Sequence, residues 1–146
     1  MEHKASNIYK MQRILTAPGV KLVAMLYDKA IDSLKDAVHA IEVGNIQARW
    51  NANLRAQEIL THLSATLDHS RGGEIAENLD RLYRFMLARL FLVDVNNDPK
   101  PALDVIALLE PLRASWHELA NQGPAPIAEA PTASDALSKK NIAVSA

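Results

Sequence analysis

The chain has 146 residues, no cysteine and a formal net charge of −1. The length suits one domain, the missing cysteine excludes disulfides and thiolate metal sites, and the near-neutral charge gives no reason to expect binding to nucleic acid or to an anionic membrane. No stretch approaches the roughly 20 apolar residues of a membrane-spanning helix, so we expect no membrane insertion. With only five glycines and 49% hydrophobic residues, the composition indicates an all-α soluble domain.

Two helical segments are predicted in the first third of the chain. Residues 1–17 are polar at first and then carry apolar side chains at helical spacing, which indicates a short N-terminal helical segment. The first long helix is predicted from Pro18 to Val43, because proline fits the first turn of a helix. Gly44 follows as the left-handed residue that often ends a helix.

Three further helices are predicted in chain order. Asn45 is a good N-cap for a second helix that extends to about His69. Residues 70–73 contain two glycines and are predicted to form the next turn. A third helix is expected over about 74–95 and a fourth over about 101–121, separated by a segment with two prolines.

Four helices of similar length joined by short turns pack as an antiparallel up-down four-helix bundle. We therefore predict three parts of the chain: an N-terminal segment over 1–17, the bundle over 18–122, and a tail over 123–146. The tail is rich in proline, alanine and serine and has too little apolar surface to order itself. We expect it to be disordered.

The predicted third helix carries an unusually wide apolar face. One apolar stripe at helical spacing comprises Leu79, Leu82, Met86, Leu90 and Val93, and a second beside it comprises Tyr83, Leu87 and Phe91. A helix with so wide a face has neighbours on two sides. One is the core, where we also place Tyr27 and Trp116, and the other is a helix of a partner. A thicker core and a homodimer contact remain alternatives.

The residue patterns give no support to an enzyme or to a metal site. The nearest match to the Glu-x-x-His motif of di-iron bundles is Asp36 with His39, and it lies on the predicted polar face. The acidic pairs Glu74/Glu77 and Asp94/Asp98 lie at helix ends, where carboxylates cap helices or interact with the macrodipole. We expect no catalytic residue, no metal and no cofactor.

Four segments together resemble the flagellar secretion chaperone family, FliS. They are TAPGVKLVAMLYD at 16–28, NLRAQEIL at 53–60, GGEIAENLDRLYRFM at 72–86 and LRASW at 112–116, and Ile8-Tyr9 resembles the aromatic start of the family. The resemblance covers roughly residues 7–120. It has one residue more than the usual pattern between Pro18 and Leu22.

The resemblance implies a chaperone of the bacterial cytosol that binds the carboxy-terminal segment of flagellin. It would prevent premature polymerisation and hand the subunit to the flagellar export apparatus, by helix-in-groove recognition. We place partner binding on the second and third helices, at Leu54, Ile59, Leu82, Tyr83, Met86, Leu87 and Leu90. Ile8 and Tyr9 are predicted to cover the groove as a lid that flagellin displaces. The alternatives are a homodimeric helical module and a regulator that binds another flagellar protein.

Overall fold

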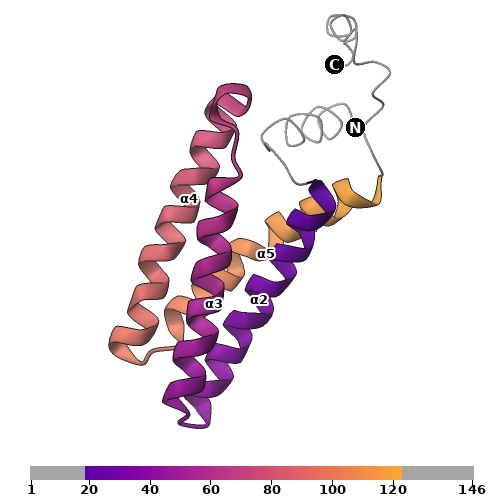
Figure 1. Ribbon diagram of the computed structural model, residues 1–146. Helices are drawn as coiled ribbons and strands as arrows, with labels where there is room; N and C mark the ends of the chain where they lie inside the picture. The colour runs from indigo at the N-terminus through magenta and orange to yellow at the C-terminus, as the bar shows by residue number, and fades with distance from the viewer. Residues whose placement is uncertain (1–18, 123–146) are drawn as a thin grey trace, which may run out of the picture.

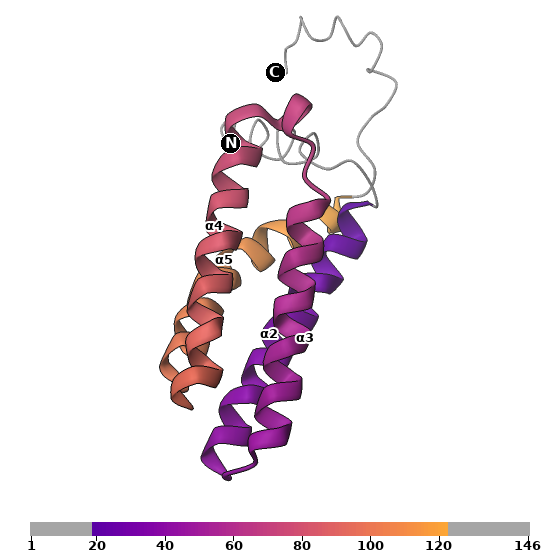
Figure 2. The ribbon, with the colours of Figure 1, turned by 60° about the vertical axis from the view of Figure 1, so that its left-hand side comes forward.

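The structure of the chain is a computed structural model that describes residues 19–122. Within this range the chain forms four helices: α2 (Val20–Glu42), α3 (Ile46–Ala65), α4 (His69–Asn96) and α5 (Lys100–Asn121). Successive helices are antiparallel, and α5 crosses obliquely from the lower end of α4 to the upper end of α2 (Figures 1 and 2). The predicted all-α four-helix bundle is confirmed. The predicted lid over 1–17 and the tail over 123–146 lie outside the described residues.

The turn between α2 and α3 has the chemistry that the sequence predicts. Gly44 has φ of 74°, and the amides of Gly44 and Asn45 donate to Ile41 O and Ala40 O at 3.1 and 2.8 Å. This is the Schellman arrangement that satisfies the last carbonyls of a helix. The side chain of Asn45 then accepts a hydrogen bond from Ala48 N at 3.0 Å. The residue that follows Gly44 therefore caps the next helix, α3.

The predicted turn at 70–73 is wrong. α3 ends at Ala65, and α4 already begins at His69, because the Asp68 side chain caps it by accepting from Arg71 N at 3.1 Å. Gly73, with φ 53° and ψ −129°, interrupts α4 after this first turn. The cap at Asp68 starts α4 before the glycines are reached. The glycine pair therefore breaks α4 internally and does not form the connection between α3 and α4.

The core contains many small side chains in α2 and α3 and larger ones in α4 and α5. The inward positions of α2 and α3 include six alanines: Ala24, Ala30, Ala37, Ala40, Ala52 and Ala56.

Tyr27 and Trp116 are fully buried, as predicted, with ring centroids 6.3 Å apart. The hydroxyl groups of Tyr27 and Tyr83 lie 2.6 Å apart across the core, and burial raises the pKa of Tyr27 to about 12.

The helices are not packed equally closely. The backbone of α2 approaches α3 and α5 along much of its length, whereas α4 makes fewer close backbone contacts with either α3 or α5. Small side chains allow close approach, and the larger inward residues of α4 hold the helix further out. The position of α4 therefore depends more on specific side-chain contacts than the position of α2 does.

Candidate protein-binding face

The nine residues predicted to bind a partner fall into three groups. Tyr83, Met86 and Leu90 lie in the core, because they form the inward stripe of α4, so they are not on the surface of the isolated chain. The partly exposed side chains are Ile59, Leu82 and Leu87, which pack against the core, and Leu54. Ile8 and Tyr9 lie outside the described residues. Whether any of the nine contacts a partner stays a prediction.

Four large exposed apolar side chains of α3 and of the last turns of α4 lie on the sides of these helices that flank the seam between them, whereas Phe85 of α4, 53% exposed, lies on another side of its helix. On α3, Ile46 is 63% exposed and Trp50 is 47% exposed. On α4, Phe91 is 64% exposed and Val95 is 58% exposed. Such side chains are normal singly, but a contiguous group marks an interaction surface.

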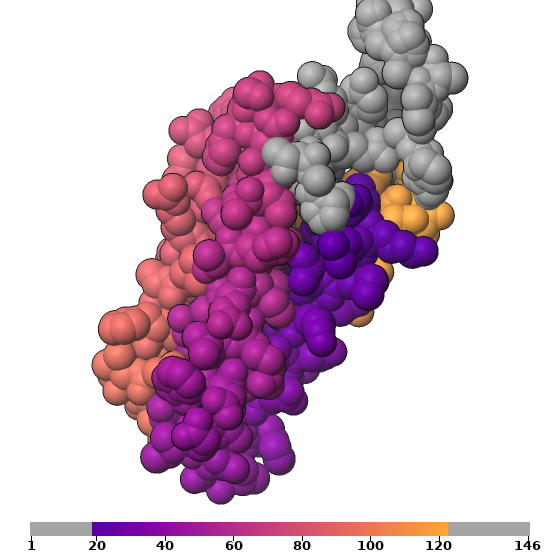
Figure 3. All heavy atoms as spheres, in the orientation of Figure 1, coloured from indigo at the N-terminus to yellow at the C-terminus, as the bar shows by residue number. Residues whose placement is uncertain are grey.

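Helical spacing and the contacts between the helices bring these side chains together. Residues four apart lie on one side of a helix, so Leu54 extends the stripe of α3 and Leu87 extends that of α4. The Asn53 side chain donates to Leu90 O at 2.8 Å, which places these parts of α3 and α4 at the same level. We call the combined surface the α3–α4 face: Ile46, Trp50, Leu54, Leu87, Phe91 and Val95. Figure 3 shows α3 and α4 side by side on one side of the molecule.

A polar cluster lies under this face. Arg49 is 7% exposed, and it donates through Nε to Asp94 Oδ1 at 3.0 Å and through Nη1 to Asn97 Oδ1 at 2.6 Å. Asn53 is fully buried and donates to Asp94 Oδ2 at 3.0 Å as well as to Leu90 O. We call Arg49, Asn53, Asp94 and Asn97 the α3–α4 polar cluster. It joins the first half of α3 to the end of α4.

A second polar contact holds the other end of the same two helices. The Ser64 hydroxyl of α3 donates to the Asp80 carboxylate of α4, and Arg84 pairs with the same carboxylate at 3.1 Å. The hydrogen bond from Ser64, more than the nearby Arg84 charge, keeps the pKa of Asp80 below its ordinary value.

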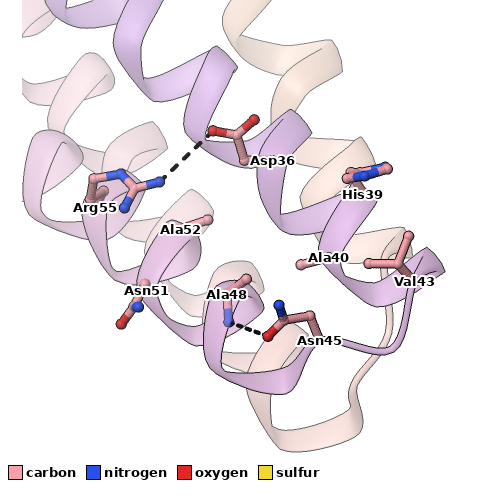
Figure 4. A pocket seen from close by; sticks show the side chains of 9 residues that line it. All are labelled: Asp36, His39, Ala40, Val43, Asn45, Ala48, Asn51, Ala52 and Arg55. Atoms are coloured by element: carbon pink, nitrogen blue, oxygen red, sulfur yellow. Dashed lines mark hydrogen bonds and ion pairs between the residues drawn. The ribbon is translucent and has the colours of Figure 1, made fainter.

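The described surface has hollows lined partly by polar side chains. One lies between α2 and α3 near their turn (Figure 4), where Arg55 reaches Asp36 at 3.8 Å and Asn45 caps α3. Its polar groups therefore serve the turn and the helix pair. Across 19–122, no group of three or more His, Asp or Glu side chains is placed to hold a metal ion, and no helix there is long and apolar enough to cross a membrane.

Sequence reasoning missed Trp50, Ile46 and Val95 as surface residues, and it missed the polar cluster. The predictions from the sequence assign no place to these side chains, and the inward stripe of α3 is formed partly by Ala52 and Ala56. A usable signal was present, because these alanines alternate at helical spacing with Arg49 and Asn53 and leave Trp50 off that stripe.

The chain is similar to known flagellar chaperones over most of its length. The sequence profile of the family described as "Flagellar protein FliS" matches residues 1–123. The flagellar secretion chaperone FliS of Vibrio cholerae is 33% identical over 99 residues, covering 68% of this chain and 73% of that protein. The one of Salmonella typhimurium is 34% identical over 107 residues, covering 73% and 79%, and that of Campylobacter jejuni is 30% identical over 117, covering 80% and 91%.

Proposed function

The chain belongs to the FliS family and is a flagellar export chaperone, and we propose that it binds the carboxy-terminal segment of flagellin on the α3–α4 face. The observation that carries the proposal is the group of exposed apolar side chains on both sides of the α3–α4 seam, led by Trp50 and Phe91. Two parallel apolar stripes on neighbouring helices form the kind of surface that receives the apolar side of an amphipathic helix.

The size and chemistry of the face fit a partner that folds as it binds. Tryptophan and phenylalanine each bury 150–250 Å² and dominate the energetics of such contacts. Ordering a disordered segment costs about 2–5 kcal/mol or more of the gross interaction energy. That cost keeps the complex reversible, as transfer to an export apparatus requires.

The proposal includes where and how the protein acts. In the bacterial cytosol, a flagellin segment covered by the chaperone is unable to pair with another flagellin, so polymerisation is delayed until export. The partly exposed Leu54 and Leu87 belong to this contact. Ile59 and Leu82 lie nine residues from Trp50 and Phe91, half a turn around their helices, and are outside the α3–α4 face. Ile8 and Tyr9 act as a lid that the segment displaces. Binding needs no nucleotide, metal or other cofactor.

The direct test is calorimetry of the full chain with a synthetic carboxy-terminal flagellin segment, with size measurement of the complex. We expect a one-to-one complex and a negative heat-capacity change, because apolar surface is buried. A variant with Trp50→Ala and Phe91→Ala removes the two largest side chains of the face, and hot-spot residues of this kind contribute about 2 kcal/mol or more each. The two losses add to about 4 kcal/mol, so we expect a loss of affinity on the order of a thousandfold.

The matched control replaces exposed apolar residues elsewhere. Met25 on α2 is 56% exposed and Leu103 on α5 is 48% exposed, so Met25→Ala with Leu103→Ala removes similar surface outside the face. This variant should bind normally. Equal losses in both variants would contradict the assignment of the face. A chain that dimerises through the face and ignores the segment would support the homodimer instead.

A further inference from the structure

The α3–α4 polar cluster has features that helix stability alone does not explain. Arg49 and Asn53 are removed from water, and the Oδ1 atom of Asn53 has no hydrogen-bond partner among the described residues. Burying charge and leaving an acceptor unpaired both cost free energy. A well-packed apolar set at the same positions is often as stable or more stable. The cluster therefore needs a reason beyond the free energy of folding.

Its geometry supplies that reason, because every one of its bonds depends on the register between the two helices. Arg49 reaches Asp94 and Asn97 at once, and Asn53 reaches both Leu90 O and Asp94. A slide of α4 by one turn, about 5.4 Å, would break all four bonds. Apolar contacts are less selective, because they tolerate many relative positions of two helices.

Four inward side chains bury α4 in the core: Tyr83, Met86, Leu90 and Val93. Apolar contacts of this kind select a register less strictly than polar bonds do. α4 makes fewer close backbone contacts with its neighbours than α2 does. The other end of the α3–α4 pair depends on the contact of Ser64 with Asp80. The polar bonds at the two ends of the α3–α4 pair are therefore the contacts that specify one register most directly.

We propose that the α3–α4 polar cluster sets the register of α4 on α3 and thereby aligns the two stripes of the α3–α4 face for its partner. Arg49, Asn53 and Asp94 are positioning residues, since they act through the placement of Trp50 and Phe91. The inference rests on the proposed function for its binding consequence. The register itself is measurable without a partner.

The first experiment measures the register directly. The chain has no cysteine, so Thr61→Cys on α3 and Ala88→Cys on α4, both at exposed positions, give two unique sites for spin labels. We expect one narrow distance distribution in the otherwise unchanged protein. When Arg49→Met, Asn53→Leu and Asp94→Leu are added, the distribution should broaden or shift by about one helical turn.

The second experiment compares affinity for the flagellin segment with thermal stability. The apolar triple variant should keep its unfolding temperature or raise it, and it should lose at least tenfold in affinity. The control replaces a polar pair that joins α4 to α5. Arg89 of α4 and Asp104 of α5 form an ion pair, and the control variant carries Arg89→Met with Asp104→Leu. The control should keep both the spin-label distance and the affinity.

The outcomes separate the two proposals. A folded triple variant with unchanged distance distribution and affinity within twofold overturns the register inference, whatever the unaltered protein binds. If the unaltered protein does not bind the segment, the proposed function fails and the spin-label distances alone decide the register. If the triple variant does not fold, Asn53→Leu alone takes its place, and it should broaden the distribution with at least a threefold loss of affinity; no change in either would overturn the inference.

Discussion

α2 and α4 both lie beside α3, yet they are attached to it in different ways. Between α2 and α3 the inward alanines allow close backbone approach, and the polar link from Asp36 to Arg55 is long and exposed. Between α3 and α4 the backbone contacts are fewer, and buried or partly buried polar bonds join the helices at both ends. Both contacts bury apolar side chains, but the first is closer at the backbone and the second has more buried polar bonds.

The difference teaches where each kind of side chain is used. Where small residues fill the inward positions, large apolar residues of the same helix turn outward, as Trp50 and Ile46 do on α3. We call the α2–α3 contact the packed side of the bundle, because the backbones approach closely there. We call the α3–α4 contact the bonded side, because polar bonds join its two ends, and it presents the α3–α4 face. The predictions below test this division, from the largest expected effect to the smallest.

Truncating a large buried side chain should cost more free energy of unfolding on the packed side than on the bonded side. Leu34 on α2 and Met86 on α4 are both fully buried, so Leu34→Ala and Met86→Ala should each cost about 2–5 kcal/mol of unfolding free energy. The cost depends on how well the surroundings collapse around the cavity, and we expect the looser α4 side to collapse more. Urea denaturation should therefore rank Leu34→Ala as the more destabilising change; the reverse order would contradict the comparison.

Enlarging a buried alanine tests how closely α2 and α3 are packed, with an exposed alanine of α4 as the control. Ala56→Leu adds volume where α2 and α3 approach closely and should cost about 1–3 kcal/mol. Ala88→Leu makes the same change at an exposed position of α4 and should stay within about 0.5 kcal/mol. Thermal unfolding of the pair is the measurement, and equal effects would show that the α2–α3 contact is not closely packed.

The tyrosine pair across the core should behave as a coupled unit. Tyr83→Phe leaves the buried Tyr27 hydroxyl without its partner, and we expect a cost of about 1 kcal/mol or more. Replacing both tyrosines with phenylalanine removes the unpaired group, so the double variant should recover most of the loss. Additive losses in the double-mutant cycle would mean that the hydrogen bond contributes nothing to stability.

The Asp80 contact should make the smallest contribution and should depend on pH. Because its pKa is lowered in the folded chain, its contribution is present above about pH 4 and is lost as the pH falls through the folded pKa. Asp80→Asn lacks this charge, so wild type should be more stable at neutral pH by no more than about 1 kcal/mol. The difference in stability between wild type and Asp80→Asn should begin to shrink below about pH 4 and should disappear once the pH is below the folded pKa of Asp80. A difference that persists at that low pH would mean that the charge is not its cause.

The sequence predicts local features of this fold well and long-range polar contacts poorly. Gly44 and Asn45 act within their own turn, so their roles are readable from neighbouring residues. Asn53 and Asp94 are 41 residues apart, and each alone resembles a surface residue of a helix. The outward position of Trp50 also depends on how closely another helix approaches. The bundle was therefore predictable, whereas the exposed apolar side chains that make up the α3–α4 face were not, and where the partner binds stays a prediction.

The exposure of Trp50 gives the most direct test of the central claim. The chain has two tryptophans, and Trp116 is fully buried while Trp50 is 47% exposed, so acrylamide quenching of the fluorescence reports mainly on Trp50. If the flagellin segment covers the α3–α4 face, saturating amounts of a tryptophan-free segment should reduce quenching and shift the emission to shorter wavelength. Binding detected by calorimetry with unchanged quenching would contradict the account.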